Sequence, residues 1–520
     1  MTMNPKELYE SLIARTSLAE LTPEAAIQHL GLLIDVSLDA QRPEGLRHAI
    51  ILAGELARTP LTPVDAVTLD YFLGNAWDNL RRLSRPENHE AWEWQQEEFE
   101  KEITHLRLAL RGEGFAEMPA VRRRQILTNL GNAMSELGRF IEATEYLSRA
   151  LADDASFSMA QGNRGVVLSR YAQTLYDPGH AMVLIRRARE DLGAALRGRT
   201  LHPGAKKFFE ARAAWVEEVL KKNARRKKVD LEGHSLGEQE AEVQYRRWCL
   251  ERGLFLNPLN DLGPHPIAAH DVLTTPSITV GLDEGPSYPG FFNQMKQEFV
   301  SARYLYYEGV SAEGSHFSDR RVLLYNTLDY PAYSLSVEKV KAAFRTAYSL
   351  LDKAAYFLND YLKLGIPERR ASFKTFWYEG QERKRGLRAE FAKRPNWPLR
   401  GLFWLSKDLY EPVPGFREAV EPDAEKLAEI RNHLEHKYLK IHDMLVRRQD
   451  LPDPLADTLA FSVARRDFEA KALRLLKMAR AALIYLSLAV HSEERRKAAG
   501  RGEKPIVPMF LGRWEDDWKL

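Results

Sequence analysis

A repeated short motif and the spacing of two glycines in the first third of the chain constrain the fold. The sequence LGNA at residues 73–76 reappears at residues 130–133, and Gly165 follows Gly131 by 34 residues. A period of 34 residues is typical of paired helices in which a glycine of the first lets the second approach closely. One such pair cannot bury its apolar face alone, so several must stack. The N-terminal part of the chain is therefore predicted to be a helical solenoid.

The unit at residues 119–153 resembles a tetratricopeptide repeat at the positions where that repeat packs its two helices. Small and large side chains stand there in the expected order: Leu130, Gly131, Gly138, Ala143, Leu147 and Ala150. The unit around Gly74 carries an insertion, so the array is irregular. We expect residues 1–228 to form four or five helical hairpins, with a capping helix over residues 203–225.

Stacked hairpins of this kind bind peptides and partner proteins on extended concave surfaces. We therefore expect a protein or peptide partner on the array. The alternative is that the array only scaffolds or dimerises the C-terminal part, because a fold does not determine a function.

The second half of the chain contains four segments with apolar residues at the helical period, which predicts a helical bundle. These segments are residues 292–305, 337–358, 427–445 and 465–494. Residues 229–240 are polar and lack periodicity, so they are predicted to be a linker. Residues 241–500 are then the C-terminal domain and residues 501–520 a tail. A long insertion rich in Trp, Pro and Arg occupies residues 366–423.

The third of these segments carries an unusual polar group within its apolar stripe. The stripe consists of Leu427, Ile430, Leu434, Tyr438, Ile441 and Leu445, and residues 431–436 read RNHLEH. Arginine can neutralise a phosphate, and histidine can move a proton near neutral pH. This group suits cleavage of RNA without a metal. The alternative is structural: an i,i+4 ion pair between Arg431 and Glu435, with a solvated histidine at position 436.

An Arg-Asn-x-x-x-His motif on a late helix of an all-helical domain resembles the HEPN superfamily of nucleotide-binding proteins and ribonucleases. A second stretch, YRRWCLERGLFLNPLNDL at residues 245–262, is similar to the opening of a bacterial HEPN subfamily that often carries tetratricopeptide repeats in front. The resemblance covers roughly residues 240–500. It implies an all-α fold: a helical-hairpin solenoid of tetratricopeptide type, followed by a HEPN-type helical bundle with a long insertion.

Cleavage of RNA by its own 2′-hydroxyl needs proton transfer at two oxygens and positive charge at the phosphate. We assign proton transfer to His436 and the phosphate to Arg431, whose charge never titrates. Asn432, one turn before His436, would orient the imidazole. The secondary candidates are His433, Glu435, Tyr438 and His442. The resemblance implies a product with a 2′,3′-cyclic phosphate and a reaction without a metal or cofactor.

The spacing of the motif raises a difficulty, because Arg431 and His436 lie roughly 140° apart on an ideal helix. Either the helix is distorted here, or the site gathers residues from two chains. A two-fold dimer would place two motifs across one groove. HEPN ribonucleases are typically such dimers, so the resemblance implies a homodimer through the C-terminal domain.

Six residues outside this segment are candidates for RNA contacts: Arg383, Lys384, Arg385, Trp397, Lys227 and Lys228. Basic side chains neutralise phosphates, and tryptophan stacks on unpaired bases. Trp377 and Trp404 could stack in the same way, although tryptophan more often lies in the core. The basic run at residues 221–228 is more often a solvated helix end, where cations favour the helix dipole.

Composition narrows the function classes. The chain has 75 basic and 73 acidic residues, so any RNA binding must come from local patches. A single cysteine, Cys249, excludes an intramolecular disulfide and fits a reducing cytosol. The first twenty residues are unlike a signal peptide, and the apolar run at 481–490 is too short to span a bilayer. We expect a cytoplasmic protein without a membrane partner, metal or cofactor.

Our first hypothesis is a metal-independent endoribonuclease of HEPN type whose array senses a partner or signal. Its substrate would be RNA of the tRNA or mRNA class, and its role as a toxin or anti-phage effector rests on the resemblance alone. The alternative is a non-catalytic adaptor, in which the array recruits a protein and the bundle binds nucleotide or dimerises.

Overall fold

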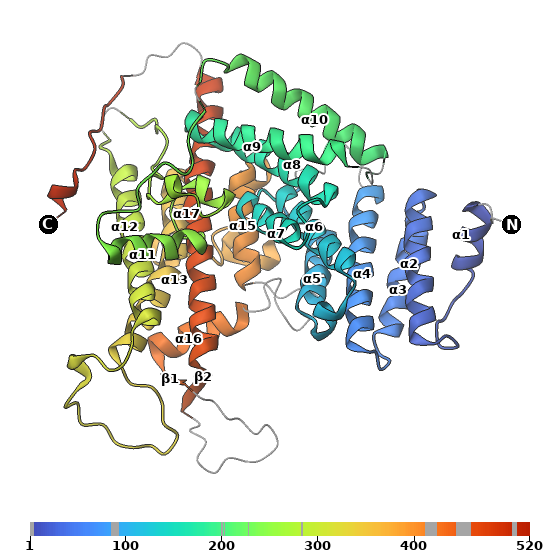
Figure 1. Cartoon of the computed structure of the whole chain (residues 1–520), viewed down its shortest axis with the longest axis horizontal. Helices are drawn as coiled ribbons and strands as arrows, with labels where there is room; N and C mark the ends of the chain where they lie inside the picture. Colours follow the sequence, from blue (N-terminus) through green and yellow to red (C-terminus); the bar gives the residue numbers. More distant parts are fainter. Residues whose placement is uncertain are drawn as a thin grey trace.

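A computed structural model describes residues 5–84, 93–198, 201, 203–226, 228–281, 284–410, 424–443, 459–501 and 507–519. Within these ranges the regular secondary structure is helical apart from one two-stranded sheet and an isolated bridge between Tyr378 and Leu387, which confirms the predicted all-α class. Figure 1 shows the N-terminal helices stacked side by side at one end of the molecule. The C-terminal helices surround the long helix α17 at the other end.

The N-terminal array is a succession of ten helices within the described residues. They are α1 (Pro5–Ile13), α2 (Pro23–Asp39), α3 (Pro43–Leu56), α4 (Pro63–Ser84), α5 (Glu97–Arg111), α6 (Ala120–Glu136), α7 (Phe140–Asp153), α8 (Ser158–Thr174), α9 (Pro178–Arg197) and α10 (Pro203–Lys222). Contacts pair α2 with α3, α4 with α5, α6 with α7 and α8 with α9. The unit predicted at residues 119–153 is the α6–α7 hairpin, and α10 lies where the capping helix is predicted.

The repeated glycines have the packing role that the pattern predicts. In each of three hairpins, a glycine of the first helix faces a leucine of the second. A Cβ atom would approach that leucine side chain to 2.8 Å for Gly74 and Leu106, 2.6 Å for Gly131 and Leu147, and 2.7 Å for Gly165 and Leu192. Since Cβ atoms do not come so close without displacement, a larger residue would push the helices apart.

The C-terminal part is a helical bundle with a small sheet. Its elements are α11 (Glu240–Glu251), α12 (Ser287–Ser311), α13 (Leu335–Tyr361), α14 (Ala389–Ala392), α15 (Trp397–Tyr410), α16 (Ala424–His436), β1 (Tyr438–His442), β2 (Ala460–Ala464) and α17 (Arg465–Arg501). Helices α12, α13 and α17 pack on one another. The four predicted helices correspond to α12, α13, α16 and α17, and Figure 1 shows α17 running through the centre of this part.

The third predicted helix is wrong beyond residue 436. Residues 438–442 form β1, which pairs in parallel with β2 from Tyr438 opposite Ala460 to His442 opposite Ala464. The prediction assigned Tyr438 and Ile441 to a helical stripe, but the buried Leu439 and Ile441 also fit the two-residue period of a strand. Pairing with β2, which is distant in sequence, decides between the two periods. Leu445 lies outside the described residues.

The predicted insertion contains part of the protein's main core. Helix α15 packs against α17, and Trp377 and Trp404 are fully buried. They contact aromatic residues of the array, with the Trp94 ring centroid 6.4 Å from that of Trp377. One continuous hydrophobic cluster runs from Trp94 to Val490. The tryptophans are therefore core residues, and Trp377 and Trp404 cannot stack on RNA bases.

Buried charges also join the array to the C-terminal part. Asp408 of α15 accepts hydrogen bonds from Arg107 at 2.9 and 3.1 Å and pairs with Arg139 as well. Arg139 in turn bonds Glu142 at 2.6 Å, and Glu142 accepts a hydrogen bond from Tyr485 of α17. Because a buried charge is stable only when it is paired, this network requires both parts of the chain. The boundaries at residues 228 and 240 stay a prediction, since the core continues across them.

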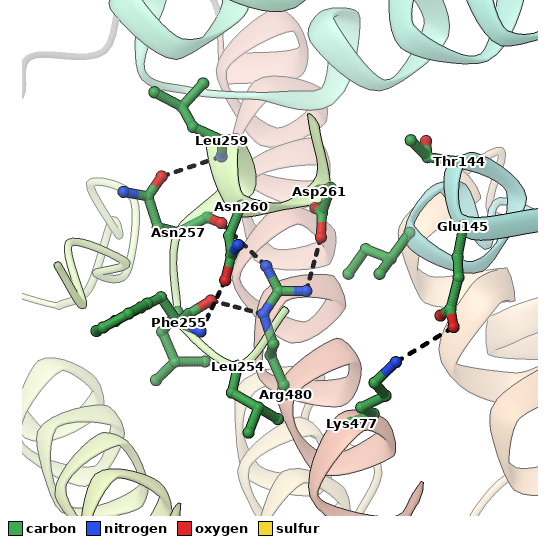
Figure 2. A network of polar contacts seen from close by, with 12 residues as sticks. Thr144, Glu145, Leu254, Phe255, Asn257, Leu259, Asn260, Asp261, Lys477 and Arg480 are labelled. Atoms are coloured by element: carbon green, nitrogen blue, oxygen red, sulfur yellow. Dashed lines mark hydrogen bonds and ion pairs between the residues drawn. The ribbon is translucent and has the colours of Figure 1, made fainter. Parts of the chain in front are cut away.

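A second network anchors the segment that follows α11, as Figure 2 shows. Arg480 of α17 donates to the Phe255 carbonyl oxygen at 2.6 Å and to that of Asn257 at 2.9 Å. It also pairs with Asp261 at 2.7 Å. The other oxygen of Asp261 accepts a hydrogen bond from Tyr171 of the array at 3.0 Å. The residues of this segment thus have a structural role, because their contacts join α8, α11 and α17.

Candidate functional site

Helix α16, which carries the RNHLEH group, is held by its apolar face. Leu427, Ile430 and Leu434 are buried, and the helix contacts α13, α15 and the small sheet. The helix is regular from Ala424 to His436, where the chain turns into β1. The polar residues of the group therefore lie on the remaining faces and near the C-terminal end of the helix.

Arg431 is half-buried and lies against α13. Its guanidinium carbon is 5.0 Å from the ring centroid of Tyr348, a distance typical of a cation–π contact. The charge also acts on Asp352 of α13: burial raises the pKa of this carboxyl, and Arg431 opposes that shift. Arg431 is thus partly shielded from solvent in a semi-enclosed position beside α13.

Asn432 and His436 are exposed. They are four residues apart and so lie one turn apart on the same side of the helix. No hydrogen bond or ion pair joins either side chain to another residue of the described ranges, so Asn432 does not hold the imidazole in this structure. Both groups are open to solvent and able to meet a ligand.

The predicted ion pair between Arg431 and Glu435 is wrong. Glu435 instead lies 3.5 Å from Nε of Arg345 on α13. Arg345 also donates to the Leu434 carbonyl oxygen at 2.6 Å, close to the end of α16. Since carbonyls at a helix end lack partners in the helix, Arg345 caps it and draws Glu435 toward α13.

The secondary candidates are engaged in structure. His433 bonds the Glu429 carbonyl oxygen at 2.9 Å, and its ring lies 5.1 Å from that of Phe461. His442 is buried in β1 and bonds the carbonyl oxygen of Asp329 at 3.0 Å.

Tyr438 exchanges a hydrogen bond with the hydroxyl of Tyr333 at 2.9 Å. Of His433, Tyr438 and His442, only Tyr438 forms its hydrogen bond at an exposed position.

Arg431 and His436 are not brought together within one chain. The helix is undistorted between them, one side chain contacts α13, and the other faces solvent. This removes the first of the two explanations considered for the motif spacing. The second, a site shared by two chains, stays a prediction.

The candidate RNA contacts are scattered. Arg383, Lys384 and Arg385 form an exposed 3-10 turn in which Lys384 and Arg385 pair with Glu382 at 3.1 and 3.2 Å. Lys228 is exposed, and Lys227 lies outside the described residues.

Trp397 does not present a free ring for base stacking. Its ring is half-buried and edge-on to Phe140 at 5.9 Å, with the Arg170 guanidinium 5.5 Å from its centroid. It is a contact between α15 and the array, because its position at the start of α15 directs it toward α7.

Comparison with protein families identifies the C-terminal part. Residues 279–493 match the family described as LA2681-like HEPN. Residues 279–493 are a HEPN domain. The match begins after the stretch at residues 245–262, so it does not depend on that stretch. No curated protein and no solved structure matches the chain.

Two residues of the HEPN domain beside α16, Arg345 and Tyr348, were missed by the sequence reasoning. Both stand next to the apolar stripe of α13, where charged and aromatic residues are ordinary, and they precede the motif by more than 80 residues. Only their contacts with Leu434 and Arg431 assign them to this region.

Other kinds of site find little support in the described part of the chain. No group of three or more His, Cys, Asp or Glu side chains there is arranged to hold a metal ion. Burial raises the pKa of Cys249 to about 11, so its thiol stays protonated at neutral pH. No helix within those ranges is long and apolar enough to cross a bilayer.

Proposed function

We propose that this protein is a metal-independent endoribonuclease whose HEPN domain cleaves RNA. The observation that carries the proposal is the side chain of His436, which is exposed near Asn432 at the end of α16 and has no polar partner among the described residues. An exposed histidine suits proton transfer at a phosphodiester, and the arginine of the same motif would supply positive charge for the phosphate.

In the proposed reaction His436 takes the proton of the 2′-hydroxyl or protonates the leaving 5′-oxygen. Arg431 binds the non-bridging oxygens of the phosphate, where its planar fork forms two charge-assisted hydrogen bonds. Tyr348 holds this guanidinium without neutralising it. Asn432 turns toward the imidazole or the RNA when substrate is bound. The product carries a 2′,3′-cyclic phosphate.

We further propose that the working site is formed by two chains. Arg431 and His436 face different directions on one regular helix. A two-fold axis near the end of α16 would set the His436 of one copy opposite the Arg431 of the other. A homodimer through the HEPN domain therefore belongs to this mechanism.

The array is proposed to receive a protein partner or a signal that controls cleavage. The shared hydrophobic core and the Asp408 network provide a rigid path from α5 and α7 to α15, which contacts α16. The RNA substrate, of the tRNA or mRNA class, would be met in the cytoplasm. We also propose that the protein acts as a toxin or in defence against phage.

The test is cleavage of total RNA and purified tRNA by the full chain in excess EDTA. His436→Ala is compared with the wild type and with a matched control, His234→Ala, which removes another exposed histidine. Arg431→Gln, Asn432→Ala and Glu435→Gln complete the set. The ends of the products are examined for a 2′,3′-cyclic phosphate, which resists phosphatase until acid opens the ring.

The proposal expects cleavage by the wild type and His234→Ala, loss of at least about 100-fold in His436→Ala, and a loss in Arg431→Gln. Cleavage that survives in His436→Ala would remove this residue from the chemistry. If the wild type cleaves no RNA, and the Arg431 and His436 variants behave like it in every assay, the second candidate is favoured.

That second candidate is a non-catalytic adaptor in which the bundle binds nucleotide or dimerises. One observation favours it: Arg431 is held against Tyr348 and does not face the same side as His436. Pull-down of partners through the array, unchanged in the Arg431 and His436 variants, is its expected result.

A further inference from the structure

Two arginines of the array lie near enough to each other to interact electrostatically. Arg170 belongs to α8 and Arg212 to α10, helices that contact one another. Both side chains are half-buried, and no carboxylate of the described residues forms an ion pair with either. Arg164, also on α8, shows the usual arrangement, since its Nε lies 2.7 Å from Asp191.

Aromatic and hydroxyl groups hold these two guanidiniums in place. Arg170 lies 5.5 Å from the ring centroid of Trp397 and donates to the Ser135 hydroxyl oxygen at 3.3 Å. Arg212 lies 4.9 Å from the ring centroid of Trp215. An aromatic face attracts a cation but does not cancel its charge. The two guanidiniums are therefore held in defined positions, and their positive charge remains available to an anion.

The electrostatic setting is unfavourable without a further anion. Burial lowers the pKa of Arg212 to about 10, and the positive charge of Arg170 acts in the same direction. Burial also lowers the pKa of Arg170, which Glu136 opposes. Glu136 is already paired with Arg81 at 3.0 Å. Two cations that repel each other in a partly desolvated place are stabilised by a bound anion.

Two buried hydrogen-bond donors at the same helices lack partners among the described residues. They are Nε of Arg212 and Nδ2 of Asn163. Asn163 precedes Arg170 by seven residues, two turns earlier on the same side of α8. Gly162, next to it, packs against Phe209 of α10, one turn before Arg212. Buried donors are normally bonded to an acceptor. A ligand with acceptor atoms between α8 and α10 would satisfy both donors.

We propose that Arg170 and Arg212 bind the phosphate group of a small ligand on the array, between α8 and α10. Two guanidiniums match the double charge of a phosphate near neutral pH better than the single charge of a carboxylate. Asn163 would supply a further donor. This site rests on the proposed sensing role of the array and names the chemistry of its ligand, but it does not depend on RNA cleavage.

The experiment measures binding to the full chain in the absence of RNA, at constant ionic strength. Inorganic phosphate, AMP and citrate are titrated by calorimetry, and the unfolding temperature is followed over the same concentrations. Arg170→Gln and Arg212→Gln remove each charge with little change of shape. Arg47→Gln, an exposed arginine on α3, is the matched control for net charge.

We expect phosphate to bind and raise the unfolding temperature of the wild type and of Arg47→Gln. Each site variant should bind at least about ten-fold more weakly, as expected for loss of a charge-assisted bond. Without added anion, both should unfold within a few degrees of the wild type, because the repulsion that each substitution relieves offsets the cation–π contact that it removes. Tighter binding of AMP would identify a nucleotide as the source of the phosphate, and equal binding would identify phosphate alone.

Three results would overturn the proposal. They are the absence of phosphate binding at millimolar concentration, binding that both site variants retain, and preference for citrate over phosphate. Earlier unfolding of the variants without a change in anion response would assign the arginines to structure instead. Absence of RNA cleavage by the wild type would leave all of these measurements unaffected, so failure of either proposal can be recognised separately.

Discussion

Two groups of polar side chains in this protein differ in how they are partnered. Where the array meets the HEPN domain, Asp408, Arg107 and Arg139 are at most 3% exposed and bonded to one another. At the end of α16, Asn432 and His436 are exposed and have no partner in the described ranges. Because a buried charge is costly unless paired, the first group holds the structure together. The second adds nothing to packing and is available to a substrate.

The largest effect is expected at the centre of the buried network. Asp408→Ala leaves the guanidiniums of Arg107 and Arg139 buried without their shared carboxylate, which should destabilise the protein by about 3–5 kcal/mol. Chemical denaturation measures this change. Asp443→Ala is the control, because this carboxylate is 65% exposed in its pair with Arg465 and should cost less than about 1 kcal/mol. Equal effects of the two substitutions would contradict the comparison.

A smaller effect, with a defined pH dependence, is expected at Asp271. Burial raises the pKa of this carboxyl, but the ion pair with Arg303 at 2.8 Å outweighs burial, so the pKa is lowered overall. A lowered pKa gives stability that is present above the unfolded value of about 3.9 and lost as the pH falls through the folded value. Asp271→Asn should cost about 2–3 kcal/mol at pH 7.

Urea unfolding at pH 7, 5 and 3 checks this prediction. The difference between wild type and Asp271→Asn should be nearly the same at the first two values and shrink at the third. A difference that grows on acidification would show that the carboxylate does not owe its stability to Arg303.

Arg431 is intermediate in burial between the two groups of side chains, since it is half-buried and contacts Tyr348. Arg431→Gln should lower stability by about 0.5–1 kcal/mol, the range for a partly exposed cation–π contact. A double-mutant cycle with Tyr348→Leu measures the coupling energy. A coupling energy near zero would mean that Arg431 is held by something other than the ring.

The smallest effect on stability is expected at His436. His436→Ala should change the free energy of unfolding by less than about 0.5 kcal/mol, because the side chain makes no contact that folding requires. The proposed ribonuclease activity should nevertheless be lost. A marked loss of stability would place His436 with the buried group, and any loss of cleavage would then have a structural cause.

Much of the fold could be predicted because its determinants are local. The glycines at 74, 131 and 165 recur with the repeat, and the apolar periods of α12, α13 and α17 are long enough to identify each helix. The prediction failed after residue 436, where helical and strand periods overlap over a few residues. There the pairing of β1 with β2 decides, and pairing is not local.

The candidate site was predictable only in part. The group at residues 431–436 could be found because arginine, asparagine and histidine interrupt an apolar stripe. The partners of its members could not, since Arg345 and Tyr348 come from α13. The tryptophans of the predicted insertion show the same limit, because composition cannot distinguish a buried ring from an exposed one.

The sequence by itself determined the helical class, the stacked hairpins and the position of the polar group on α16, because residue spacing along one segment sets each of these. Only the tertiary structure decided which charges are buried and paired, that one core joins the array to the HEPN domain, and which way Arg431 and His436 face. The physical reason is that burial and pairing depend on contacts between segments far apart in the chain. Arg107 is buried and paired with Asp408, whereas Arg212 lies beside Trp215 without an ion pair to a carboxylate of the described residues.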